Sequence, residues 1–159
     1  FVDPEAAKIV FESGIPIRMV GLNLTRQQVV TREMGEKIAA IQNPAAQLAA
    51  QLCGDRNGKP GRDSFCDACA VMWMVEPSVI TKSAKMHVTI ETKGEFTRGM
   101  TVCDTRPFRA NRPEVDIERE WLFEPLPKGK EPNVEVALEL DQAKFDQALL
   151  AVMEEYSQS

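Results

Sequence analysis

The sequence has little histidine, no block of basic residues and no long apolar run. Its 159 residues include one histidine, and 24 acidic residues outnumber 19 basic ones, which gives a net charge of −5. An acidic chain without a basic stretch argues against nucleic-acid binding. The longest uninterrupted apolar run, residues 68–75, is too short to span a bilayer and is typical of a buried helical segment.

The sequence also shows no signal-peptide pattern and too few cysteines for a disulfide-dense scaffold. Four cysteines in a chain that is 43% hydrophobic indicate an ordinary globular protein with reduced thiols. We therefore expect a cytoplasmic location. Because the chain opens at Phe1 and reaches a helix almost at once, we also expect it to be a segment of something longer.

The first half of the chain predicts a helix followed directly by a strand, an order typical of α/β proteins. Asp3-Pro4-Glu5 is a favourable helix start, because it combines an N-cap, a first-turn proline and an acid near the positive helix end. An interior strand is predicted at residues 17–24, with Met19, Val20 and Leu22 buried, and a capping box at residues 25–28. Further helices are predicted at residues 31–41, 44–52 and 68–75.

The second half predicts antiparallel or edge strands and a final helix. Apolar and polar residues alternate at 86–91, 100–103 and 134–140, which indicates strands with one covered face. Five prolines and many charges make residues 105–132 a predicted surface insertion. Asp141 is the predicted cap of an amphipathic C-terminal helix.

The residues that could carry chemistry gather at Cys66-Asp67-Ala68-Cys69, after a glycine-rich loop that runs from Gly54 to Phe65. In a structural interpretation, Asp67 caps a helix and the cysteines are small buried hydrophobes. In a second, Cys66 and Cys69 form a redox or zinc site, although zinc needs four ligands and the chain has one histidine. In a third, Asp67 binds a hard cation where a loop meets a helix N-terminus.

Five motifs resemble those of the inosine–uridine preferring nucleoside hydrolases, in family order. They are residues 2–16, Met19-Val20-Gly21-Leu22-Asn23-Leu24-Thr25, Asp67-Ala68-Cys69-Ala70-Val71, Gly94-Glu95-Phe96-Thr97-Arg98-Gly99-Met100-Thr101-Val102 and Pro132-Asn133-Val134-Glu135-Val136-Ala137-Leu138. The resemblance covers nearly the whole chain but only the second half of the family's fold. It implies an open, mainly parallel sheet with helices, followed by antiparallel strands and a C-terminal helix, all within one domain of residues 1–159.

The resemblance also implies a function for the parent protein. The family hydrolyses the N-glycosidic bond of ribonucleosides to free base and ribose, with a water activated by a calcium ion. Asp67 occupies the position of a calcium ligand. Cys66 occupies the position of the family's histidine, which assists the leaving base, and the loop from Gly54 to Phe65 should border the base pocket.

Two departures from the family limit what this chain does alone. The family's aspartate cluster and its ribose-binding residues would lie before Phe1, so the chain by itself should not bind calcium tightly. We expect it to associate with a complementary N-terminal half or with copies of itself. The alternative is a non-catalytic fragment or subunit that binds a partner through its incomplete sheet. The second departure is Cys66, because a thiol is a weaker hydrogen-bond donor than imidazolium.

Three other conspicuous residues are expected to be structural. We expect His87 to be a surface or half-buried residue within a strand and Trp73 to belong to the core. Arg98 is expected to be structural, although it could reach a carboxylate at a subunit contact.

Overall fold

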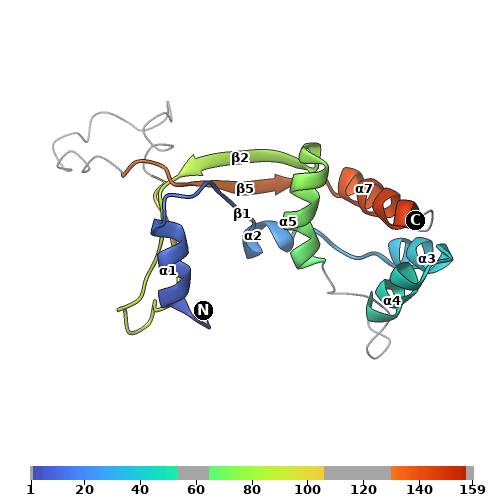
Figure 1. The fold of residues 1–159 in the computed structure, drawn as a ribbon, viewed down its shortest axis with the longest axis horizontal. Helices are drawn as coiled ribbons and strands as arrows, with labels where there is room; N and C mark the ends of the chain where they lie inside the picture. Colours follow the sequence, from blue (N-terminus) through green and yellow to red (C-terminus); the bar gives the residue numbers. More distant parts are fainter. Residues whose placement is uncertain (1, 54–64, 106–129, 157–159) are drawn as a thin grey trace, which may run out of the picture. The chain divides into compact units, whose positions relative to one another are not determined.

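The computed structural model describes residues 2–53, 65–105 and 130–156 (Figure 1). The described residues form both helices and strands, which confirms the α/β class. Two compact units form: Phe1–Arg18 with Lys85–Glu135, and Met19–Ala84 with Val136–Ser159. Within the described parts, no helix is long and apolar enough to cross a membrane.

Two predicted segments fall almost wholly outside the described residues. The predicted loop begins at Gly54, which is not described, and only its last residue, Phe65, is. The predicted insertion at 105–132 is described only at its two ends. Both therefore stay predictions from the sequence.

The first unit is built from helix α1 (Pro4–Glu12) and strands β3 (Val88–Ile90) and β4 (Thr101–Cys103). As predicted, Asp3 caps α1, and its carboxylate accepts the N–H of Ala6 at 2.9 Å. β3 and β4 pair antiparallel, which confirms the predicted strand type, and α1 packs against β3.

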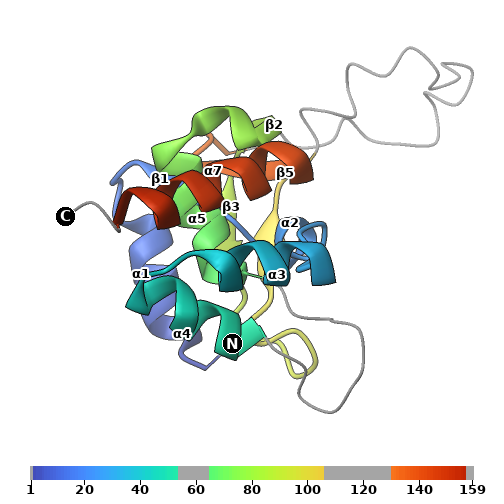
Figure 2. The ribbon, with the colours of Figure 1, turned by 90° about the vertical axis from the view of Figure 1, so that its right-hand side faces the viewer.

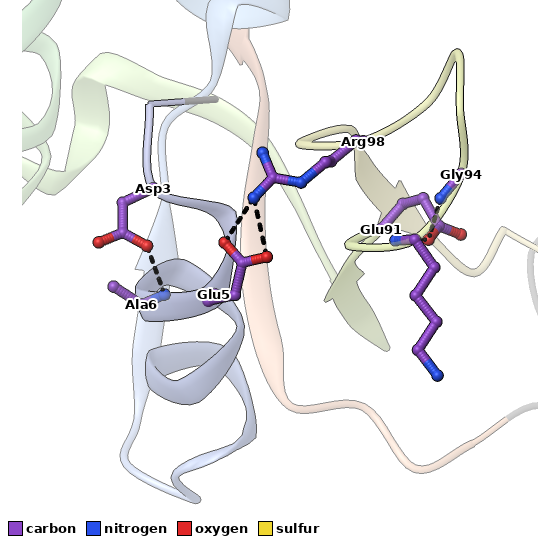
Figure 3. A network of polar contacts seen from close by, with 7 residues as sticks. Asp3, Glu5, Ala6, Glu91, Gly94 and Arg98 are labelled. Atoms are coloured by element: carbon purple, nitrogen blue, oxygen red, sulfur yellow. Dashed lines mark hydrogen bonds and ion pairs between the residues drawn. The ribbon is translucent and has the colours of Figure 1, made fainter.

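An ion pair fastens the loop between β3 and β4 to α1. The Arg98 Nη2 lies 2.8 Å from both carboxylate oxygens of Glu5 (Figure 3). Arg98 therefore has a structural role, as expected, and its carboxylate partner lies in its own chain. Both side chains are about half exposed, so the pair contributes little stability and mainly selects one loop position.

The same loop is also shaped by Glu91. Its Oε1 accepts the N–H groups of Lys93 and Gly94 at 2.7 and 3.0 Å, and these bonds hold the pKa of Glu91 below its ordinary value (Figure 3). A Cβ at Gly94 would overlap the Thr97 hydroxyl, and Gly99 has a φ of +84°. The backbone at Gly99 therefore favours glycine, and a side chain at Gly94 would require Thr97 to move.

Within the first unit, the side chain of Asn133 links β3 to the C-terminal end of α1. Its Oδ1 accepts the Val88 N–H at 2.7 Å, and its Nδ2 donates to the carbonyls of Val88 and Phe11 at 2.9 and 2.8 Å. One side chain thus extends the pairing of β3 and ties it to the end of α1.

A three-stranded sheet has the order β1-β5-β2, with β1 (Ile17–Met19), β5 (Val134–Leu140) and β2 (Ile80–Met86). β2 and β5 run in opposite directions (Figure 1). An exposed pair, Lys82 Nζ to Glu139 Oε1 at 2.8 Å, links them.

The predicted strand at 17–24 is wrong beyond Met19. The chain turns into a short helix, α2 (Leu22–Thr25), which exposes Leu22 and buries Leu24. The physical reason lies in the polar residues that follow. The Asn23 amide donates to the Ala137 carbonyl at 3.0 Å, so α2 covers the edge of β5 that β1 leaves open.

Besides α2, the described part of the second unit contains four helices: α3 (Arg32–Ala40), α4 (Pro44–Cys53), α5 (Cys66–Val75) and α7 (Gln142–Glu155). The cap of α7 is Asp141, as predicted, and the cap of α4 is Asn43. The predicted capping box at 25–28 is wrong, because α3 begins after Thr31, whose hydroxyl accepts the Met34 N–H. α3 packs on both α4 and α7 (Figure 2).

One apolar cluster holds this unit together. Its buried members come from every helix of the unit, from the 3₁₀ turn η1 (Pro77–Val79) and from β5: Leu24, Met34, Ile38, Ala46, Cys69, Met72, Trp73, Val79, Ala137, Phe145 and Leu149. Trp73 is therefore a core residue, as expected.

We predict that Asn133→Ala lowers the free energy of unfolding by about 2–3 kcal/mol, because it leaves three part-buried backbone groups without their partner. Lys82→Ala, which breaks only an exposed ion pair, should lower it by less than about 1 kcal/mol. Urea unfolding of both variants measures the difference, and equal losses would contradict this role of Asn133.

Candidate active site

The candidate site is the N-terminus of helix α5 (Cys66–Val75). Its N-cap is Phe65, which makes no side-chain capping bond, and Asp67 lies in the first turn. The predicted cap at Asp67 is therefore wrong by two residues. An acid in the first turn still lies near the positive end of the helix dipole.

Helical geometry separates the two cysteines of the motif. Cys66 and Asp67 are both exposed, whereas Cys69, one turn further, is fully buried in the core. Burial, and next the neighbouring Cys66, raise the pKa of the Cys69 thiol to about 11. Cys69 thus behaves as a small buried hydrophobe, as the structural interpretation expected, while Cys66 and Asp67 are available to a ligand.

A buried glutamine holds the start of α5. Gln28 is 1% exposed, and its Oε1 accepts the N–H of Phe65 at 2.6 Å. Phe65 in turn accepts the N–H of Cys69 at 3.1 Å and packs against the apolar core. The sequence did not identify Gln28, because no sequence pattern indicates that a single polar residue after a short helix is buried.

The loop expected to border the base pocket can be placed only at its C-terminal end. Phe65, its last residue, is partly buried against the core and leads directly into α5. Its first residue, Gly54, and the residues up to 64 lie outside the described part of the chain. The contact of this loop with a base therefore stays a prediction.

Asp67 fits a hard cation as one ligand and no more. Calcium takes six to eight oxygen ligands, and an exposed carboxylate in a first helical turn can provide one or two. Across residues 2–53, 65–105 and 130–156, no three acidic, histidine or cysteine side chains come together to hold a metal. Further ligands would have to come from outside these residues.

His87 does not join this site. It is half-buried, as expected, but the prediction that it lies within a strand is wrong, because β2 ends at Met86 and β3 begins at Val88. Its Nδ1 is 3.2 Å from the Glu131 carbonyl oxygen. That contact fits a structural role.

The outer face of α5 is apolar. The prediction of a helix buried on nearly every side is wrong: Met72 and Trp73 are buried, but Val71, Met74 and Val75 are 56%, 75% and 57% exposed. An apolar helical face of this kind is typical of a surface that contacts more protein.

The chain belongs to the inosine-uridine preferring nucleoside hydrolase family, whose model matches residues 1–147. It is 37% identical, over 99% of its length, to the pyrimidine-specific ribonucleoside hydrolase RihA of Shewanella woodyi. It is 36% identical over 79% of its length to the RihA of Escherichia coli strain K12. The chain spans 46% and 44% of these two relatives, or about half their length.

Solved structures support the fold. A purine-preferring ribonucleoside hydrolase from Gardnerella vaginalis superposes with a TM-score of 0.68, at 22% identity over 96% of this chain and 44% of that one. A plant nucleoside hydrolase gives a TM-score of 0.68 at 21% identity, over 95% and 45%. The described units therefore have the fold of about half a nucleoside hydrolase.

We predict that folding protects Cys69 from alkylation by iodoacetamide at pH about 8. Raising the pKa from 9.0 to about 11 lowers the thiolate fraction about 100-fold relative to the urea-unfolded chain, and burial slows the reaction further. Mass spectrometry of each site reports the rates, with the exposed Cys66 as the internal control. Equal labelling of both in the folded chain would contradict the arrangement.

The same shift predicts how stability depends on pH. The folded state holds the Cys69 proton more tightly than the unfolded state does. The contribution of this protonated thiol to the free energy of unfolding is therefore complete below about pH 9. It should be lost as the pH rises from about 9 to about 11, and Cys69→Ala should remove this part of the dependence.

Proposed function

We propose that this chain is the C-terminal part of a single nucleoside hydrolase domain, which cleaves the N-glycosidic bond of ribonucleosides to free base and ribose. The observation that carries the proposal is the first turn of α5. It presents Cys66 and Asp67 side by side, both exposed, within the stretch that resembles the family's site motif.

Asp67 would hold the metal. Its carboxylate lies at a helix N-terminus, is exposed and has a hard oxygen donor, so it suits calcium as one ligand among several. When bound, calcium lowers the pKa of a water molecule. Asp67 would hold and orient the ion. Removing its carboxylate should therefore lower activity on every nucleoside to the same extent.

Cys66 would face the leaving base. It precedes Asp67, so its side chain points about 100° away around the helix and can approach a different part of the same substrate. A thiol can donate a proton or a hydrogen bond to a base, but weakly. The loop from Gly54 to Phe65 is proposed to border the base pocket, and the RihA relatives are described as pyrimidine-specific.

We predict that Asp67→Ala and Cys66→Ala have different effects on calcium affinity and on kcat/KM, when measured in an enzyme completed by the family's N-terminal half. Asp67→Ala should weaken calcium affinity by at least about 100-fold, since even the groups behind a metal's ligands contribute about 10–100-fold. Cys66→Ala should leave calcium affinity intact and lower kcat/KM by no more than about 100-fold, to different extents for inosine and uridine.

Calcium titrations and kcat/KM on both nucleosides, measured for the wild type and the two alanine variants, check this division. Cys66→His is the matched variant, because it should favour the base that needs protonation to leave. The assignment is wrong if both alanine variants lose equally on both substrates and excess calcium rescues both.

The exposed face of α5 is proposed to dock the rest of the family's fold. The relatives are about twice as long as this chain, and Val71, Met74 and Val75 form an apolar face on the helix that carries the site. Docking there would bring further ligands close to Asp67. The alternative function, a non-catalytic subunit that binds a partner through its incomplete sheet, would use the β1 or β2 edge instead.

We predict that Met74→Glu weakens association with a complementary N-terminal half at least about tenfold, because docking would bury a charge. Val152→Glu is the matched control, since it places the same carboxylate on a partly exposed apolar site of α7. Titration calorimetry against a purified N-terminal half measures both affinities. If Met74→Glu binds the N-terminal half as tightly as the wild type does, α5 is not part of the interface.

A further inference from the structure

We propose that Gln28 is a positioning residue, which sets the location of Cys66 and Asp67 through the backbone of Phe65. The geometric part of this inference stands on the structure, and its consequence for turnover rests on the proposed function.

The contact joins two segments that are far apart in sequence. Gln28 Oε1 accepts the N–H of Phe65 at 2.6 Å, and Gln28 is 1% exposed, so water competes little for this bond. Phe65 has a non-helical backbone, with φ −76° and ψ 61°, and the helix begins at the next residue. Wherever Gln28 holds Phe65, Cys66 and Asp67 must follow.

The start of α5 packs against the core through Phe65 but has no side-chain cap. The first N–H groups of a helix lack partners within it, and a phenylalanine at the N-cap cannot supply a side-chain acceptor. Cys66 and Asp67 are exposed, so their own side chains add little packing. Displacement of catalytic groups by about 1 Å can lower a rate about 100-fold, so this point of attachment bears on function.

Packing alone does not require a glutamine here. Gln28 Nε2 is buried, and the described residues offer it no hydrogen-bond partner. An apolar side chain of similar size would fill the same space without burying that polar group. The amide is therefore explained by its oxygen, which is the atom that holds Phe65.

The neighbouring residue makes Gln28 a firm support. Gln27 donates from Nε2 to the Leu138 carbonyl at 2.8 Å and accepts the Leu140 N–H at 3.1 Å. It thereby pairs with β5 much as another strand would. Gln28 thus extends from a backbone segment that is itself tied to the sheet.

Hydrogen exchange tests the geometric part on the 159-residue chain. Gln28→Met keeps the volume and removes the acceptor, so exchange of the Phe65 N–H should speed up about tenfold. Gln27→Met is the comparison variant. It loosens the segment that carries Gln28 but keeps the bond to Phe65, so exchange of the Phe65 N–H should speed up less than in Gln28→Met. Gln28→Glu should restore slow exchange at pH about 5, where burial keeps its carboxyl group protonated and close in shape to the amide.

Unchanged exchange at Phe65 in Gln28→Met, or equal acceleration by Gln27→Met, would overturn the inference whether or not the enzyme is active. In the completed enzyme, Gln28→Met should lower kcat about tenfold or more and raise the calcium concentration needed for half-maximal rate, with rescue by Gln28→Glu at the same acidic pH. Faster exchange with unchanged kcat and calcium dependence would leave Gln28 a merely structural residue and also overturn it. A wild-type completed enzyme without hydrolase activity would instead overturn the proposed function, and the exchange data would still decide the role of Gln28.

Discussion

Much of the second unit depends on side-chain amides that bond to the edge of strand β5. β1 is only three residues long, so the backbone of β5 beyond it would lack partners. Asn23 and Gln27 supply them, at Ala137, Leu138 and Leu140. This pairing fixes α2 against the sheet, and the next residue, Gln28, bonds to the start of α5. The six residues 23–28 therefore connect the edge of the sheet to the candidate site.

The site helix has two contrasting faces, and both bear on function. Its inner face, with Cys69, Met72 and Trp73, anchors α5 in the core. Its first turn exposes Cys66 and Asp67, and its outer face exposes apolar side chains that suit a protein contact. If the rest of the family's fold docks there, assembly and catalysis are coupled, because the helix that completes the interface also carries the proposed metal ligand.

Local signals were predicted well, because they act over a few residues. Asp3 and Asp141 cap helices as expected, since a short polar side chain needs only the N–H groups of the next turn. The prediction failed at residues 20–24, where an apolar stretch has the composition of a strand. What decided between strand and helix there was the open edge of β5, which lies more than a hundred residues away in the sequence.

The sequence by itself determined the family, the α/β class and the two residues proposed to do the chemistry. This was possible because sequence motifs and the alternation of apolar and polar residues depend only on the order of residues. Only the tertiary structure decided that Cys69 is buried while Cys66 is exposed, that one face of α5 is left uncovered, and that Gln28 holds Phe65. Burial and hydrogen bonding depend on which distant segments pack together. A glutamine 37 residues before its partner gives no sign, in the sequence alone, of which backbone group it will bind.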